Sequence, residues 1–242
     1  MSIDGKQAWL NTPAGIYLQE QEQRLFDDAV SDVFGFNAVQ LGMPEMDLLR
    51  NSRIPFLFKA SEQHGLVHCD PGHLPFTNNS LDLILLPHTL EFSENPHQTL
   101  REAERVLVPE GHIMLTGFNP ISAWGVRRFM STRESYPWNG RAFSLLRIKD
   151  WLELLGFELV AGHMACYAPP CRNPVWLNKL RFMDKAGDRW WPMMGGVYFV
   201  TAKKRVIGMR LIRPNWGKSR LKAGLVPTPT QKNDQQKEQV EQ

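Results

Sequence analysis

Three polar residues, Asp70, His88 and Asn119, each follow a short apolar run of the sequence and carry side chains that could do chemistry. A carboxylate at Asp70 could accept hydrogen bonds from an amine or a hydroxyl of a nucleoside. His88 could take a proton from a nucleophile, and Asn119 could orient a polar group of a substrate. Each has a structural alternative, because Asp70 opens an Asp-Pro-Gly turn, His88 could bond a loop carbonyl and Asn119 precedes a proline.

The apolar runs before these residues alternate with amphipathic segments along the chain. Short runs rich in Leu, Val, Ile and Phe predict strands, and an apolar period of 3.6 residues predicts helices. We expect strands at 36–41, 54–60, 66–69, 81–86, 112–117, 157–161 and 197–202. We expect helices at 19–34, 45–51, 96–106 and 150–155, and a turn at 109–111.

This alternation predicts an α/β fold, with a doubly wound, mostly parallel sheet flanked by helices. In such sheets, ligands bind at the carboxyl ends of the strands, so the residues just past each strand are the site candidates. We expect one domain over residues 1–206, in which an aromatic and arginine-rich insertion at about 121–147 lies over one edge of the site. A basic tail at 207–242 with little to bury is expected to be disordered.

The segment 69–120, CDPGHLPFTNNSLDLILLPHTLEFSENPHQTLREAERVLVPEGHIMLTGFNP, resembles the central part of class I S-adenosylmethionine-dependent methyltransferases. An acidic residue ends the third expected strand, Leu-Pro-Phe follows, and small residues lead into SLDLILL. HTLEF, the helix LREAERVL and PEG then come in the family's order. The resemblance covers about residues 11–204 and implies a Rossmann-like fold. The chain is also similar to an uncharacterised bacterial branch in which GFNPIS follows the fifth strand.

The resemblance implies where S-adenosylmethionine, the family's cofactor, would bind. Asp70 would bind the adenine amino group, with Pro71 in the same turn and the backbone and side chain around Leu74 flanking the ring. Pro87 and His88 follow the fourth expected strand, where the family places the cofactor against the substrate.

Two further cofactor positions match the family only in part. Gly42 corresponds to the first glycine of the turn after the first strand, but Met43 and Pro44 stand where small residues are usual. The second strand leads into Ser61, where an acid that binds the ribose is usual, and Glu62 comes one residue later. These departures support a second hypothesis, a catalytically inactive binding or scaffold protein on the same fold.

The first hypothesis is a methyltransferase whose acceptor lies against the insertion. A small molecule, a lipid-like quinone precursor and a nucleic acid all stay open as acceptors. Residues 203–222 hold eight basic and no acidic residues, which favours an anionic acceptor. The same stretch contains Trp216 and supports a third hypothesis, a nucleic-acid-binding module. The alternative is a solvated tail against the chain's own acidic surface.

The composition excludes several other classes of protein. Hydrophobic residues make up 43% and charged residues 22% of the 242 residues, as in globular proteins. Cys69, Cys166 and Cys171 are too few for a disulfide framework and favour a cytoplasmic protein. Neither the group of His64, His68, Cys69 and His73 nor that of His163, Cys166 and Cys171 has the spacing of a zinc site, so no metal is expected. No signal peptide and no apolar run of membrane-spanning length is predicted, so we expect no membrane partner.

Overall fold

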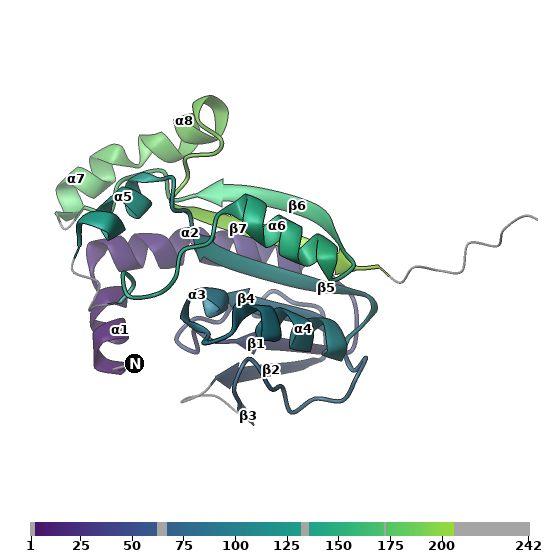
Figure 1. The fold of residues 1–242 in the computed structure, drawn as a ribbon. Helices are drawn as coiled ribbons and strands as arrows, with labels where there is room; N and C mark the ends of the chain where they lie inside the picture. The colour runs from purple at the N-terminus through teal and green to yellow at the C-terminus, as the bar shows by residue number, and fades with distance from the viewer. Residues whose placement is uncertain (1–2, 62–66, 132–135, 172, 206–242) are drawn as a thin grey trace, which may run out of the picture. The chain divides into compact units, whose positions relative to one another are not determined.

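The computed structural model describes residues 3–61, 67–131, 136–171 and 173–205, which form the helices and strands drawn in Figure 1. The helices are α1 (Ile3–Leu10), α2 (Pro13–Val30), α3 (Thr89–Phe92), α4 (Pro96–Val106), α5 (Ala123–Met130), α6 (Leu145–Leu154), α7 (Pro174–Leu180) and α8 (Phe182–Trp190). The strands are β1 (Asn37–Leu41), β2 (Phe56–Ser61), β3 (Val67–His68), β4 (Leu81–Pro87), β5 (Leu107–Phe118), β6 (Phe157–Ala165) and β7 (Val197–Lys204).

The strands form one sheet in the order β3-β2-β1-β4-β5-β7-β6. The pairs from β3 to β5 are parallel, whereas β7 runs antiparallel to both β5 and β6. The direction of winding reverses between β1 and β4, which is where ligands bind in sheets of this kind. The predicted doubly wound, mostly parallel sheet is confirmed.

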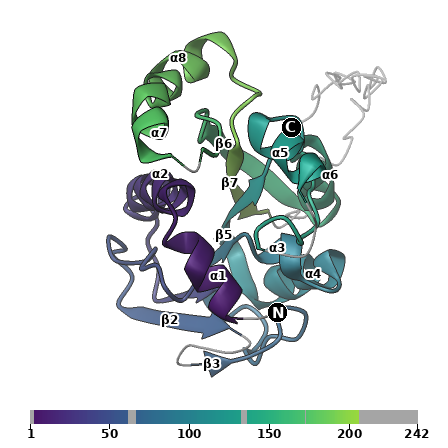
Figure 2. The ribbon, with the colours of Figure 1, turned by 90° about the vertical axis from the view of Figure 1, so that its left-hand side faces the viewer.

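Helices cover both faces of this sheet, with α2 on one face and α4 and α6 on the other (Figure 2). Successive residues of β4 therefore pack on opposite sides. Leu83 and Leu85 share a buried cluster with Phe26 of α2, whereas Ile84 belongs to the cluster that contains Leu100 of α4. Burial on both faces explains why β4 is an almost continuous apolar run in the sequence.

Two local predictions were wrong. Residues 45–51 form turns instead of a helix. The buried side-chain amide of Gln40 binds the carbonyl oxygen of Met46, which a helix would pair with the amide of residue 50. The turn expected at 109–111 lies inside β5. There Glu110 has a φ of 66°, and the β4–β5 register shifts between Leu81 and Leu83, so the strand continues through an irregularity.

Other boundaries differ because capping signals were overlooked. α2 begins at Pro13, six residues earlier than expected, because the Thr12 side chain accepts a hydrogen bond from the amide of Gly15 at 3.2 Å. α1, α3, α7 and α8 were not predicted, and α5 lies within the expected insertion. The tail at 207–242 lies outside the described residues. Within the described part of the chain, we find no helix with the length and apolar character needed to cross a membrane.

Candidate active site

The turn after β1 is built by a buried glutamine. Gly42 has a φ of 88° and Met43 a φ of 45°, so the chain turns sharply just past the strand. The Gln40 side chain donates to the carbonyl oxygens of Gly42, Met43 and Met46 at 3.1, 2.9 and 3.1 Å, and accepts from the amide of Leu48 at 3.1 Å. Gln40 was not among the predicted site residues, although it is a polar residue inside an apolar strand.

The exits of β1 and β4 are joined directly. The Thr89 hydroxyl donates to the carbonyl oxygen of Leu41 at 2.6 Å and lies 3.3 Å from that of Pro87. A Cβ atom on Gly42 would lie 3.3 Å from the same hydroxyl, and its backbone angle also favours glycine. Gly42 and Pro87, two of the predicted cofactor positions, therefore lie together at the switch point.

His88 lies between two glutamates in the interior. Its Nδ1 is 2.7 Å from Glu91 Oε2, and its Nε2 is 2.6 Å from Glu22 Oε1 on α2. The other oxygen of Glu91 accepts from the amide of Phe118 at 2.6 Å, and the His88 ring packs against the Phe118 ring. We call Glu22, His88 and Glu91, which are all buried, the acidic centre.

The acidic centre carries a net negative charge. Burial alone would lower the pKa of His88, but the charges of Glu22 and Glu91 outweigh this effect and raise the pKa to about 10. His88 is therefore an imidazolium between two carboxylates near neutral pH, and both of its ring nitrogens donate. Both nitrogens are bonded to glutamates, so neither can accept a proton from a methyl acceptor. The geometry favours a role for His88 in holding Glu22 and Glu91 in place. Its assignment as a base stays a prediction.

Three buried oxygens near this centre have no hydrogen-bond partner among the described residues. They are Glu22 Oε2 and the hydroxyls of Thr116 and Tyr136. Burial, and then the charges of Glu22 and Glu91, hold the pKa of the Tyr136 phenol well above its usual range, so it stays protonated. The sequence offered no local signal for this group, because Glu22 lies 66 residues before His88.

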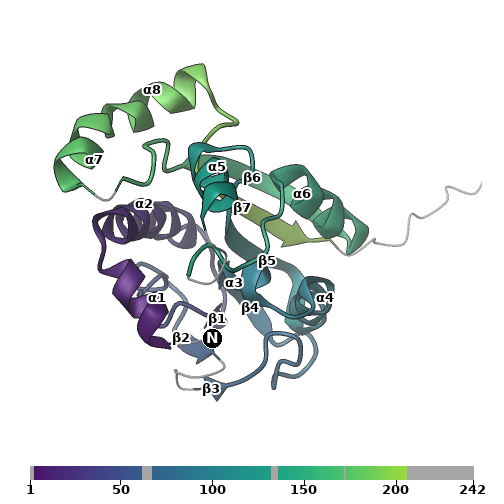
Figure 3. The same ribbon diagram turned by 60° about the vertical axis from the view of Figure 1, so that its left-hand side comes forward.

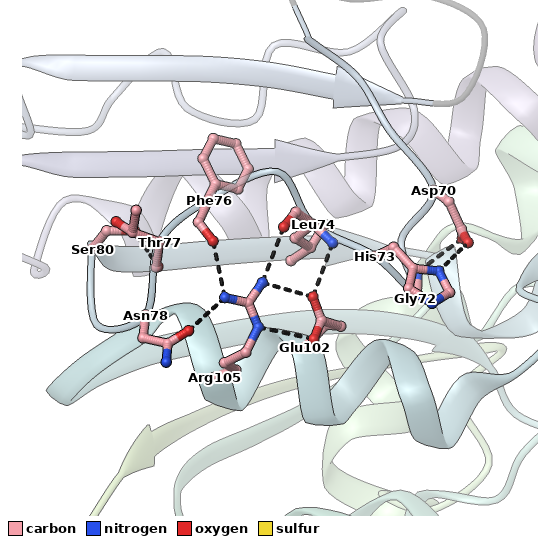
Figure 4. Close-up of polar contacts among 10 residues, drawn as sticks. All are labelled: Asp70, Gly72, His73, Leu74, Phe76, Thr77, Asn78, Ser80, Glu102 and Arg105. Atoms are coloured by element: carbon pink, nitrogen blue, oxygen red, sulfur yellow. Dashed lines mark hydrogen bonds and ion pairs between the residues drawn. The ribbon is translucent and has the colours of Figure 1, made fainter.

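The exit of β3 is a polar loop at the surface (Figure 4). Asp70 accepts from the amide of Gly72 at 2.8 Å and pairs with Nδ1 of His73 at 2.9 Å. The His73 hydrogen bond and then that of Gly72 lower the pKa of Asp70, so it is a carboxylate at neutral pH. Each of its oxygens has one of these partners, and the side chain is exposed. Pro71 is half-buried in the same turn.

The next stretch of this loop is held by an ion pair on α4. The Leu74 amide donates to Glu102 at 3.0 Å, and its carbonyl oxygen accepts from Arg105 at 3.0 Å. Arg105 also donates to the Phe76 carbonyl oxygen at 3.0 Å and pairs with Glu102 at 2.8 Å. The backbone groups of Leu74 therefore already have partners, and its buried side chain packs with the core.

The remaining predicted positions lie at the exits of β2 and β5. Ser61 ends β2 and is half-buried opposite His68 of β3, and Glu62 lies outside the described residues. The Asn119 side chain donates to the carbonyl oxygens of Met193 and Gly195 at 2.9 and 3.0 Å and accepts from the Ile121 amide at 3.1 Å. Asn119 therefore fastens the segment before β7 to the exit of β5.

An aromatic cavity of about 380 Å³ lies beside these exits. Its lining comes from α1, the start of α2, α5 and the segments at 136–138 and 170–171, and consists of Trp9, Thr12, Pro13, Ala14, Arg127, Tyr136, Trp138, Pro170 and Cys171. Tyr136 also belongs to the buried cluster that contains Met43. Lys6 of α1, the helix that carries Trp9, pairs with Glu45 in the turn after β1 at 3.4 Å, so the α1 wall of the cavity lies beside that turn. Among the described residues, no group of three or more His, Cys, Asp or Glu side chains could hold a metal ion.

Comparison with known proteins gives the class. A family model described as a methyltransferase domain matches residues 50–115. Among solved structures, an S-adenosylmethionine-dependent methyltransferase of Thermotoga maritima has a TM-score of 0.56 at 16% identity, covering 82% of this chain and 94% of that one. One from Archaeoglobus fulgidus has a TM-score of 0.54 at 16% identity, covering 76% of this chain and 92% of that one. These two structures share the fold.

The chain belongs to the class I S-adenosylmethionine-dependent methyltransferase family, and S-adenosylmethionine is the cofactor of that family. It is 33% identical over 208 residues to the uncharacterized protein YafS of Escherichia coli K12. The aligned residues cover 84% of this chain and 82% of YafS. The predicted family, enzyme class and cofactor are confirmed.

The residues at the strand exits fit this cofactor, which combines a nucleoside with a positively charged sulfonium. The exposed Asp70 carboxylate can accept from an amine or a hydroxyl. Gly42 is partly accessible at the switch point. The acidic centre has a net negative charge and an unpartnered oxygen at Glu22, which suits a nearby positive charge in a medium of low dielectric constant. Lys59, near the end of β2, carries a positive charge close to these exits, and this charge is paired with Asp47 at 3.1 Å.

Proposed function

We propose that this methyltransferase transfers the methyl group to an apolar, anionic small molecule held in the aromatic cavity. One observation carries the proposal: the cavity has aromatic walls, a single charged side chain at Arg127, and a position beside the turn after β1. Pockets for small molecules are typically apolar with a few placed polar groups. This acceptor agrees with the anionic substrate that the sequence favoured.

Arg127 is the group that would select a negative charge. Its guanidinium lies 5.8 Å from the centre of the Trp138 ring, and no described carboxylate forms an ion pair with it. A guanidinium beside an aromatic wall suits a planar ring that carries a carboxylate, sulfonate or phosphate.

The chain's own residues would act mainly by positioning and by excluding water. When bound, S-adenosylmethionine supplies an electrophilic methyl group for in-line attack by the acceptor. Asp70 would accept a hydrogen bond from the nucleoside, and the acidic centre would favour the positive charge. Because both nitrogens of His88 are occupied by Glu22 and Glu91, the acceptor would need a nucleophile that already has an available lone pair. Asn119 would act indirectly, by fixing the segment before β7.

Calorimetric titration with S-adenosylhomocysteine tests the cofactor part of this proposal. We expect binding at micromolar concentration and a loss of about tenfold or more in Asp70→Ala, since a charged hydrogen bond contributes roughly 1.5–3 kcal/mol. Glu153→Gln, a similarly exposed carboxylate on α6, is the matched control and should bind normally. A folded protein that does not bind at millimolar ligand would overturn the proposal.

Such a result would favour the second candidate, a non-catalytic binding protein. The specific observation behind it is Met43, which is buried at the turn where the family has small residues. Pro44 beside it has no amide hydrogen to donate. In this candidate the two residues would restrict the access of a cofactor to the turn.

The acceptor part is tested with naphthalene probes of equal size and different charge. We expect 2-naphthoate to bind several-fold more tightly than 2-naphthalenemethanol, and this preference to disappear in Arg127→Gln. Arg128→Gln is the control, because Arg128 does not line the cavity. Equal binding of the two probes to the unmodified protein would contradict an anionic acceptor without touching the cofactor result.

A further inference from the structure

The helices α5, α7 and α8 carry large apolar side chains on the outside of the molecule. They lie near the carboxyl ends of the parallel strands, with α7 and α8 together and α5 below them (Figure 3). We call this surface the apolar tip. Its exposed residues are Ile121, Val126, Phe129, Met130, Val175, Trp176, Phe182, Trp190, Trp191, Met193 and Met194.

Polar contacts and buried aromatic side chains hold the helices of the tip against α2 and the segment after β6. The hydroxyl of Tyr17 on α2 donates to Asp184 of α8, and Arg181 pairs with Glu20 of α2. The Trp124 indole of α5 donates to the carbonyl oxygen of Ala168 at 2.9 Å. Asp184 and Arg181 are therefore directed towards α2, whereas many large apolar side chains of these helices face outward. This is the reverse of an ordinary surface helix.

Several of these side chains are exposed over most of their surface. Phe129 is 82% exposed, Met130 80% and Trp190 71%, so most of each side chain has no protein neighbour. Apolar groups gathered on one face in this way mark an interaction site. A protein partner is usually gripped by side chains set in well-packed pockets, whereas projecting Trp, Phe and Met side chains suit insertion into a fluid layer.

The charge of the tip indicates what kind of layer this is. Residues 121–131 and 173–195 contain six basic and two acidic residues. Asp184 is already bound to Tyr17, and Arg181 is already paired with Glu20, both of α2. Lys179 lies 5.4 Å from the centre of the Trp176 ring. Aromatic side chains flanked by Lys and Arg are typical of helices that lie in the headgroup region of a membrane, and each cation gains from anionic lipid.

We propose that the apolar tip docks this chain on the surface of an anionic lipid bilayer. The sequence predicted no membrane partner, and this proposal revises that prediction. The tip enters the boundary between headgroups and acyl chains without crossing the membrane. The exposed Lys179 and Arg189 pair with lipid phosphates, and Phe129, Met130 and Trp190 enter the apolar layer. This inference rests on the exposed surface and does not depend on methyl transfer.

Co-sedimentation of the full chain with lipid vesicles tests the proposal. We compare vesicles of phosphatidylglycerol and phosphatidylethanolamine with vesicles of phosphatidylcholine alone. We expect binding to the anionic vesicles that weakens as salt is raised, because the electrostatic part is screened. The variant Phe129→Ser with Trp190→Ser should lower the partition coefficient about tenfold or more.

The matched control is Phe36→Ser. Phe36 is 72% exposed and precedes β1, at the opposite edge of the sheet from the tip, so this variant should bind normally. An equal loss in Phe36→Ser, or no binding of the unmodified protein to anionic vesicles, would overturn the proposal. So would sedimentation equilibrium showing a stable dimer without lipid that the double variant abolishes, because a second copy would then cover the tip.

Discussion

The exits of β3 and β4 contain the same kind of pair in opposite surroundings. In each, a carboxylate and an imidazole three residues apart lie within hydrogen-bond distance. Asp70 and His73 are 2.9 Å apart with side chains 59% and 80% exposed. His88 and Glu91 are 2.7 Å apart with side chains 1% exposed. Water screens the first pair, whereas the second interacts in a low dielectric. Burial, more than the identity of the partners, therefore decides what such a pair contributes.

The two exits consequently serve different ends. The β3 pair leaves a carboxylate facing solvent, where it can bind a ligand. The β4 pair, extended by Glu22, joins α2 to the sheet and fixes the local charge. Substitutions should therefore affect ligand affinity at one exit and folding at the other.

The largest effect is expected for His88→Gln. It removes the only positive charge of the acidic centre and leaves Glu22 and Glu91 buried with like charges. Breaking a buried ion pair costs about 3–5 kcal/mol, so the free energy of unfolding in urea should fall by that order. His73→Gln at the exposed pair should stay within about 0.5 kcal/mol. Similar losses of unfolding free energy in His88→Gln and His73→Gln would contradict the claim that burial decides what each pair contributes.

The next effect is a pH dependence of stability that arises from His88. Its pKa is about 6.5 in an unfolded chain and about 10 in the folded protein. The folded state therefore binds more protons in this window, and stability, fully present below pH 6.5, falls as the pH rises towards 10.

Unfolding in urea between pH 7 and 8.5 measures this slope. We expect a loss of up to about 1.4 kcal/mol per pH unit. The upper limit of the window avoids the buried Cys166, whose pKa is raised well above its usual value by burial. His88→Gln should have a nearly flat profile. A slope equal to that of the unmodified protein would exclude His88 as its source.

The same contrast explains what the sequence could predict. The β3 exit is local, since Asp70, the turn that follows it and Leu74 lie within five residues, and a family pattern identifies them. The acidic centre joins Glu22 on α2 to His88 after β4, and that contact depends on how α2 packs on the sheet. The sequence therefore predicted the strands and their mostly parallel winding, and the assignment of Asp70 to the cofactor stays a prediction. It did not identify Glu22, Gln40 or Tyr136 as site residues.

Errors in local structure have a similar origin. The helix expected at 45–51 is absent because Gln40, a strand residue, binds the carbonyls of the following turn. A period of apolar residues reports which side chains are buried and carries no information on such side-chain-to-backbone contacts. α7 and α8 were missed for another reason, since they expose the apolar residues that a periodicity analysis expects to be buried.

A smaller effect is expected for Arg105→Lys at the β3 exit. Arg105 donates to Glu102, to the carbonyl oxygens of Leu74 and Phe76, and to Asn78 at 2.7 Å. A lysine carries its three donors on one nitrogen and cannot reproduce the planar set of hydrogen bonds that the guanidinium makes. We expect a loss of about 1 kcal/mol in unfolding free energy, given that the side chain is partly exposed. Arg101→Lys, an exposed arginine on the same helix, is the control and should be neutral.

The smallest effect on folding is expected for Asp70→Asn, although it alters the proposed adenine-binding carboxylate. Its two hydrogen-bond partners, Gly72 and His73, can exchange with water because the side chain is exposed. The free energy of unfolding should therefore change by less than about 0.5 kcal/mol, while the affinity for S-adenosylhomocysteine falls. Chemical denaturation and calorimetry on one preparation measure both quantities. A large loss of stability would mean that Asp70 stabilises the loop after β3, as the acidic centre stabilises the core. It would contradict the proposal that the β3 exit affects ligand affinity and the β4 exit affects folding.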